Sequence, residues 1–161
     1  MSLPPVKREA GMAEKNSLFL VFHIGDERYA LQATDVVEVL PRLALKPIAH
    51  APAWVAGVFS HRGQVVPVID VSALTFGEPA VARTSTRLVL VNYRTKASQS
   101  PELLGLILEQ ASNTLRCNPQ DFQPYGLDNP DAPYLGPVRQ DQLGFLQRAP
   151  LDHLLSPQLC P

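Results

Sequence analysis

Hydrophobic residues in this chain occur in short runs, and residues typical of turns separate these runs. Leu18–Ile24 is a run of β-branched, aromatic and aliphatic side chains, which predicts a strand buried on both faces. Gly25-Asp26 follows as a turn signal, and Arg28–Gln32 then alternates between polar and apolar positions. Together these segments predict a β-hairpin at the start of the folded region.

The same kind of pattern recurs along the chain and predicts further strands. Pro67 interrupts one of them and, because proline cannot donate a hydrogen bond to a sheet, favours an edge or bulged position there. The turn His61-Arg62-Gly63 joins two of the segments into a second hairpin. The predicted strands are Leu43–Ile48, Val55–Ser60, Gln64–Asp70, Arg87–Tyr93, Leu103–Leu108, Ser112–Leu115 and Gly144–Gln147, with a bend at Gln110-Ala111.

Only short helices are expected. In Thr34–Leu40, the apolar residues Val36, Val39 and Leu40 follow i, i+3, i+4 spacing and Pro41 ends the element, which predicts about two helical turns. Two further helical turns are predicted at Val71–Phe76, which Gly77 closes, and at Pro150–Leu155.

The strand count and the proline content together predict an all-β fold with minor α content. The chain has 161 residues and 16 prolines, about twice the usual ~5% share, and proline is excluded from long helices. We expect a flexible arm at 1–16, one folded domain at 17–155 and a tail at 156–161. The proline-rich segment 118–137 is expected to be functional or mobile.

Composition excludes several classes of function. The net charge is −1 and no basic face is evident, so no nucleic-acid partner is expected. No apolar run reaches the ~18 residues of a membrane helix, and residues 1–15 lack a signal-peptide pattern, so we expect a cytoplasmic protein without membrane insertion. Charged residues make up only 18%, which favours apolar surface patches for partners. Cys117 and Cys160 are expected to be free thiols.

No catalytic, cofactor or metal motif is found. The sequence has no P-loop, GxGxxG, HExxH or GxSxG pattern, and its four histidines show no ligand spacing. Ser60 and His61 are adjacent and point to opposite faces of extended chain, so they cannot act as a nucleophile and base. A solvated turn edge is the simpler interpretation of this pair. We therefore expect no enzyme, no cofactor and no bound metal.

Two stretches resemble the CheW-like chemotaxis coupling family. The first is Phe19–Leu31, FLVFHIGDERYAL, followed by VVEV at Val36–Val39. The second is Pro52–Val71, PAWVAGVFSHRGQVVPVIDV, in which a G-V strand, an R-G turn and V-P-V-I-D follow one another. The resemblance implies two SH3-like five-stranded β-barrel subdomains that share a hydrophobic core. It implies a non-enzymatic adaptor that couples the cytoplasmic tip of a methyl-accepting chemoreceptor to the regulatory domain of a CheA-type histidine kinase.

The resemblance also implies a protein-binding surface. Relatives pair the residues at Glu38 and Arg62 in an ion pair, and the residue at Val36 contacts a partner. Gly63, Ser60, His61 and Arg87 are expected on or near the same surfaces. Ser60-His61 replaces the usual Asn-Leu, and Trp54 and Arg87 are also departures, so we expect partners from a chemotaxis-like pathway that controls something other than swimming.

One alternative of another class stays open. A small β-barrel can bind a small molecule if polar groups converge in a pocket. Trp54, His61 and Tyr93 are the candidates for such a pocket in this sequence.

Overall fold

The fold consists of nine strands and little helix in the residues that the structure describes. The computed structural model describes residues 16–93, 102–124 and 137–150. A short helix α2 (Val71–Phe76) and two 3₁₀ turns, η1 (Ala33–Asp35) and η2 (Pro119–Asp121), accompany the strands. The strands are β1 (Ser17–Ile24), β2 (Glu27–Gln32), β3 (Val36–Pro41), β4 (Val55–His61), β5 (Gln64–Asp70), β6 (Arg87–Tyr93), β7 (Glu102–Cys117), β8 (Val138–Asp141) and β9 (Gly144–Arg148).

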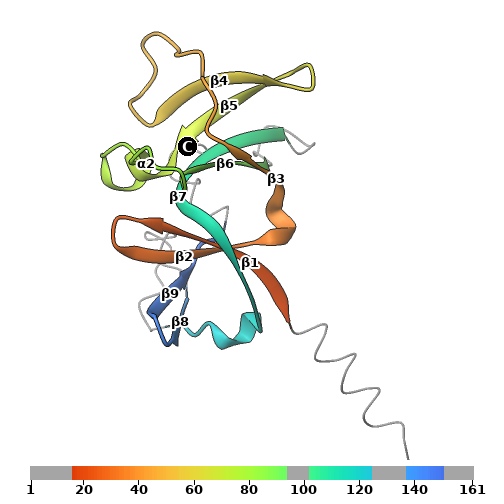
Figure 1. Ribbon diagram of the computed structural model, residues 1–161, viewed down its shortest axis with the longest axis vertical. Coiled ribbons are helices and arrows are strands. Elements are labelled where there is room, and N and C mark those ends of the chain that lie inside the picture. Colours follow the sequence, from red (N-terminus) through yellow and green to blue (C-terminus); the bar gives the residue numbers. More distant parts are fainter. Residues whose placement is uncertain (1–15, 94–101, 125–136, 151–161) are drawn as a thin grey trace, which may run out of the picture.

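Five strands form a first barrel in the upper half of Figure 1. Their order is β4-β5-β7-β6-β3, antiparallel except between β5 and β7. The chain after β3 then returns to β4, where Lys46 and Val58 exchange two backbone hydrogen bonds of 2.9 Å. These bonds close the sheet on itself and bring the end of β3 toward the β4–β5 hairpin.

The remaining strands, together with β7, form a second barrel in the lower half of Figure 1. Their order is β7-β1-β2-β9-β8, and β2 and β9 run parallel. The chain after β7 passes through η2 and pairs with β8, where Gln123 and Val138 exchange backbone hydrogen bonds of 2.7 and 3.0 Å. The sequence had predicted no strand at β8, because its residues are mostly polar.

Strand β7 belongs to both barrels and joins them. Its first half pairs with β5 and β6, and its second half pairs with β1. The predicted strands Leu103–Leu108 and Ser112–Leu115 are therefore one strand, Glu102–Cys117, in which Gln110 has a left-handed φ of 49°. The expected bend at Gln110-Ala111 lies where β7 passes from one barrel to the other. The expected pair of SH3-like barrels is confirmed.

The hydrophobic core explains why β1 is apolar at successive positions. Leu20, Phe22 and Ile24 face a large cluster to which strands of both barrels contribute, whereas Phe19 and Val21 face a second cluster inside the lower barrel. In β2, Leu31 faces the shared cluster, since alternate side chains of a strand point to opposite faces. The prediction that β1 is buried on both faces is confirmed.

The predicted helix Thr34–Leu40 is wrong. The structure has the η1 turn at Ala33–Asp35 followed by strand β3, which pairs with β6. Side-chain exposure in β3 alternates with a period of two, and Val37 and Val39 point outward. The spacing of the apolar residues fitted a helix, but the β-branched valines fit an extended strand and the pairing with β6 decides between them.

Two other predictions about extended segments need correction. Leu43–Ile48 is not a strand and contributes only the single bridge at Lys46. Strand β5 is not an edge strand throughout, because it pairs with β7 from Val68 onward. Pro67 lies one residue before this pairing begins, so β5 has a free edge only as far as the proline.

The predicted helix Val71–Phe76 is confirmed. The Asp70 carboxylate caps it by accepting a hydrogen bond from the Ala73 N–H, and Gly77 ends it with a left-handed φ of 78°. The predicted arm at 1–16 lies outside the described residues except for Asn16, as do residues 151–155 of the predicted last helical turn and the tail. No helix in the described parts of the chain is long and apolar enough to cross a membrane.

Candidate functional site

The β4–β5 hairpin places Arg62 at an exposed tip of the first barrel. Arg62 and Gly63 form the two-residue turn and have φ values of 52° and 83°. Positive φ at both positions is the pattern of a type I′ turn, whose twist matches that of the flanking strands. Glycine adopts this conformation freely, whereas the arginine does so only because the hairpin requires it. The Arg62 side chain is 80% exposed.

Closure of the first barrel brings Glu38 of β3 to this turn. Oε1 of Glu38 lies 3.5 Å from Nη2 of Arg62, which is the ion pair that the resemblance implied. The same Oε1 also lies 3.5 Å from Nε2 of His61. The structure therefore brings three of the expected site residues together, with the carboxylate between an imidazole and a guanidinium.

His61 is more buried than a solvated turn edge would be. Its side chain is only 14% exposed, and its ring packs edge-on against Phe59 with the ring centroids 6.1 Å apart. Phe59 and His61 are two residues apart on β4 and share a face of the strand, whereas Ser60 points to the other face and is exposed. The prediction of a solvated pair thus holds for Ser60 and is wrong for His61.

The geometry at Glu38 gives a loose electrostatic contact. Both distances of 3.5 Å exceed the 2.7–2.9 Å that is typical of a charge-assisted hydrogen bond. Ion pairs with an exposed member typically add about 0–1 kcal/mol to stability. The contact is therefore better suited to orienting side chains for a partner than to holding the barrel together.

Within the described part of the chain, Val36 and Arg87 are not part of the ion-pair contacts among Glu38, His61 and Arg62. Val36 pairs with Val91 and packs, partly buried, against the shared core. Arg87 begins β6, opposite Pro41 at the far end of β3, and its guanidinium donates hydrogen bonds to the carbonyl oxygens of Thr84 and Thr86. Among the described contacts, Arg87 takes no part in the Glu38 cluster.

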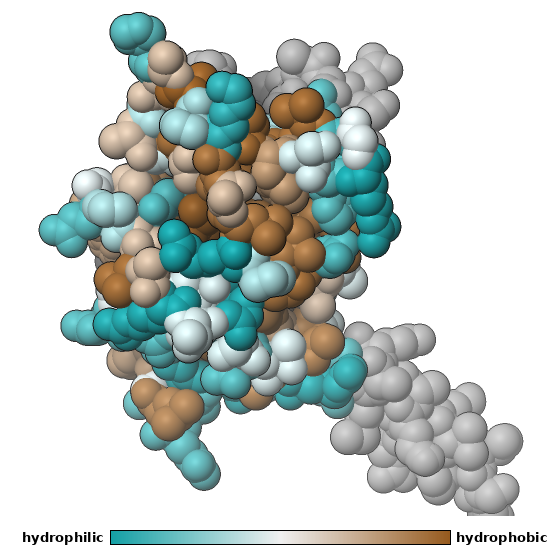
Figure 2. Space-filling view, turned by 45° about the horizontal axis from the view of Figure 1, so that its top comes forward, coloured by the Kyte–Doolittle hydropathy of each residue, from teal (hydrophilic) through white to brown (hydrophobic). Residues whose placement is uncertain are grey.

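Apolar side chains are exposed on the first barrel. Figure 2, in which the top of Figure 1 comes forward, shows hydrophobic surface in the middle of this face with hydrophilic residues around it. Val65 of β5 lies across the hairpin from Ser60 and is 69% exposed. Large apolar residues exposed on the strands of this barrel and on the segment between β3 and β4 are Val37, Val39, Leu43, Ile48 and Val65. Exposed apolar side chains of this kind are suited to contact with another protein.

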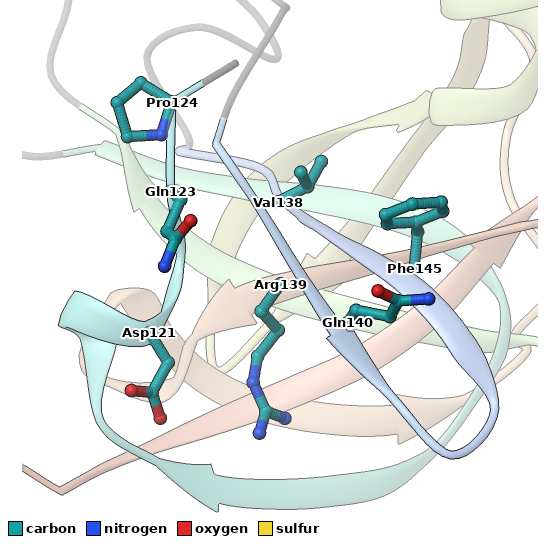
Figure 3. Close-up of a pocket in the computed structure, with 7 residues that line it drawn as sticks. All are labelled: Asp121, Gln123, Pro124, Val138, Arg139, Gln140 and Phe145. Carbon is teal, nitrogen blue, oxygen red and sulfur yellow. The ribbon is translucent and has the colours of Figure 1, made fainter.

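The three residues proposed for a small-molecule pocket have different settings. Tyr93 belongs to the shared core, Trp54 is half-buried against it, and His61 lies at the hairpin tip. A surface pocket of about 460 Å³ lies instead on the second barrel, between η2 and the β8–β9 hairpin (Figure 3). Its lining consists of Asp121, Gln123, Pro124, Val138, Arg139, Gln140 and Phe145, which includes none of the three.

Comparison with known proteins agrees with the fold. The profile of the CheW-like domain family matches residues 18–146. The chain is 30% identical over 105 residues to the chemotaxis protein CheW of Rhizobium meliloti, which covers 65% of this chain and 64% of that protein. It is 34% identical over 85 residues to the protein FrzA of Myxococcus xanthus, covering 53% and 52% of the two chains. The chain thus spans just under two thirds of the length of the first relative and about half of the second.

A solved structure of similar fold is that of the scaffolding protein TtCheW from Thermoanaerobacter tengcongensis. The TM-score is 0.69 with 20% sequence identity, over 86% of this chain and 87% of that one. At this identity the similarity shows the fold.

Proposed function

We propose a function on the basis of the family to which this chain belongs, the CheW-like domain family. The protein is a non-enzymatic adaptor in chemotaxis or chemotaxis-like signalling. It joins the cytoplasmic tip of a methyl-accepting chemoreceptor to the regulatory domain of a CheA-type histidine kinase, in the cytoplasm at receptor clusters on the inner face of the membrane. The observation that carries the proposal is the contact of Glu38 with Arg62, because this pair is expected from the family and Arg62 is exposed at the tip of a hairpin.

The kinase-binding surface is proposed at the β4–β5 end of the first barrel. Arg62 offers a planar fork of donors that suits recognition of a carboxylate, and Val65 adds an exposed apolar contact beside it. Charged groups at such a rim set the register and the rate of association more than the affinity.

The proposed mechanism is positional. An adaptor that binds receptor and kinase at the same time raises the effective concentration of one near the other, with no chemical step of its own. It needs two separate surfaces on a rigid body, and two barrels that share strand β7 and one core supply such a body. Small receptor movements then bias the activity of the bound kinase.

Calorimetry with the regulatory domain of the CheA-type kinase from the same genome tests this proposal. We expect micromolar binding, about −8 kcal/mol, that Arg62→Glu weakens at least about tenfold by placing two carboxylates together. Arg116→Glu is the matched control, since Arg116 is exposed on the second-barrel half of β7 and carries the same charge. Equal effects of the two variants, or no binding by the unchanged protein, would argue against the proposal.

Circular dichroism and thermal unfolding separate a lost interface from a lost fold. The loose geometry at Glu38 predicts that Arg62→Glu leaves the spectrum unchanged. Unfolding of this variant would show instead that Arg62 supports the hairpin.

We also propose that the partners belong to a pathway whose output is not swimming, because Ser60 and His61 at the hairpin, and Trp54 and Arg87 outside the Glu38 contacts, depart from the residues usual in relatives. Expression in a strain that lacks its motility adaptor tests this. Restoration of swimming bias to the level given by the native adaptor would refute it.

A further inference from the structure

Glu38 faces two side-chain nitrogen atoms, and its carboxylate is therefore not reserved for Arg62. Nε2 of His61 and Nη2 of Arg62 lie at the same distance, 3.5 Å, from the same oxygen, Oε1. A proton on Nε2 makes the His61 contact favourable, because an unprotonated ring nitrogen would face the carboxylate with its lone pair. The His61 ring also packs against Phe59, while its Nε2 lies toward Glu38.

Arg62, in turn, has donors to spare. A guanidinium carries five N–H donors, and Glu38 is the only ion-pair partner of Arg62 within the described part of the chain. With 80% of the side chain exposed, most of these donors face solvent. They can donate hydrogen bonds to a second carboxylate if the negative charge of Glu38 does not repel it.

We propose that His61 is a positioning residue that partly offsets the charge of the Glu38 carboxylate, so that Arg62 can bind an acidic side chain of the partner protein at the tip of the β4–β5 hairpin. This inference rests on the proposed function, and it adds His61 and the chemistry of the partner to that site. His61 lowers the cost of bringing a second carboxylate to the turn because its donor offsets the charge of Glu38.

The proposed partner surface is an acidic side chain beside an apolar one. Val65 is 69% exposed, lies two residues after Gly63 and shares the outer face of the hairpin with Ser60. The inner face carries Phe59 and His61. The hairpin thus presents a guanidinium at its tip and an apolar side chain on its outer face, while His61 supports the arrangement from the inner face.

A double-mutant cycle on binding to the kinase regulatory domain tests the inference. We expect His61→Leu to weaken binding about three- to tenfold, in the range of a rim charge interaction. His61→Gln, which keeps a donor, is expected to bind within about twofold of the unchanged protein. In a Glu38→Gln background, His61→Leu is expected to have almost no effect, because no carboxylate charge remains to be offset.

The outcomes separate this inference from the function on which it rests. A His61→Leu effect that persists in the Glu38→Gln background, or that His61→Gln does not rescue, would overturn the role of His61 while leaving the adaptor intact. Loss of all binding by the unchanged protein would instead reject the proposed function. The free protein supplies a second readout that needs no partner. His61→Leu is expected to shift the NMR resonances of the Glu38 carboxyl carbon and the Arg62 Nε. Unchanged resonances would overturn the inference.

Discussion

Arg28 binds the carboxylate of Asp141 through two parallel hydrogen bonds. Nη1 donates to Oδ1 at 2.9 Å and Nη2 donates to Oδ2 at 3.1 Å, across 113 positions of the sequence. The pair joins β2 to the end of β8, and both side chains are mostly buried. This bidentate contact helps to hold the β8–β9 hairpin on the second barrel, and the N–H of Leu143 donates to Asp141 within the hairpin turn.

The Arg28–Asp141 pair predicts a loss of stability in acid. The hydrogen bonds from Arg28, and then the N–H of Leu143, lower the pKa of Asp141 below its ordinary value of 3.8. A lowered folded-state pKa gives stability that is fully present well above pH 3.8 and is lost as the pH falls through the folded value. Asp141→Asn is expected to cost about 1.5–3 kcal/mol at neutral pH, with a smaller difference from the unchanged protein at lower pH.

Urea unfolding at several pH values between about 2 and 7 measures this difference. Asp26→Asn is the control, because Asp26 is an exposed carboxyl in the β1–β2 turn. A cost of Asp141→Asn that stays constant over the whole range would contradict the assignment.

Gly57 is expected to be intolerant of any side chain. Its φ is 146°, and a Cβ there would lie 2.6 Å from the carbonyl oxygen of Lys46, where the first barrel closes. Gly57→Ala is expected to destabilise the protein by about 1–3 kcal/mol from backbone strain and further by the clash. At Gly25, whose φ is 62° and where a Cβ meets nothing within 4 Å, alanine brings strain without a clash. Equal unfolding free energies of the two variants would show that barrel closure tolerates the methyl group.

Cys117 is expected to be an unreactive thiol in the folded protein. It is buried beside Phe122 and Leu146, and burial is the main reason why its pKa is raised above 9.0. Because the thiolate is the reactive form, a Cys160→Ser variant is expected to react with a thiol reagent at least about tenfold more slowly when folded than in denaturant. Similar rates in the two states would mean that the second barrel opens easily.

The local elements of the fold could be predicted from the sequence. The β1–β2 hairpin, the β4–β5 hairpin and helix α2 depend on turn residues and on side-chain patterns a few residues apart. Strand β3 was mistaken for a helix because Val36, Val39 and Leu40 satisfy helical spacing as well. Its pairing with β6, about 50 positions later, selects the strand over the helix. No local sequence pattern contains that information.

The barrel closures and the candidate site depend on contacts distant in sequence. Strand β8 has little apolar signal, and its place depends on β9, Gln123 and the Arg28–Asp141 pair. The Glu38–Arg62 pair was expected from the family resemblance rather than from the charge pattern. The contact of His61 with Glu38 could not be predicted, because the predicted strand ends at Ser60 and places His61 in the turn, whereas strand β4 extends to His61 and puts it on the same face as Phe59.

The most direct test of the adaptor proposal is sedimentation of the full-length kinase with receptor-containing membranes, with and without this chain. We expect the kinase to sediment with the membranes when the chain is present, to stay largely in the supernatant without it, and to remain there when Arg62→Glu replaces the unchanged protein. Sedimentation that is the same with and without the chain would contradict the proposal that this protein couples a receptor to a kinase.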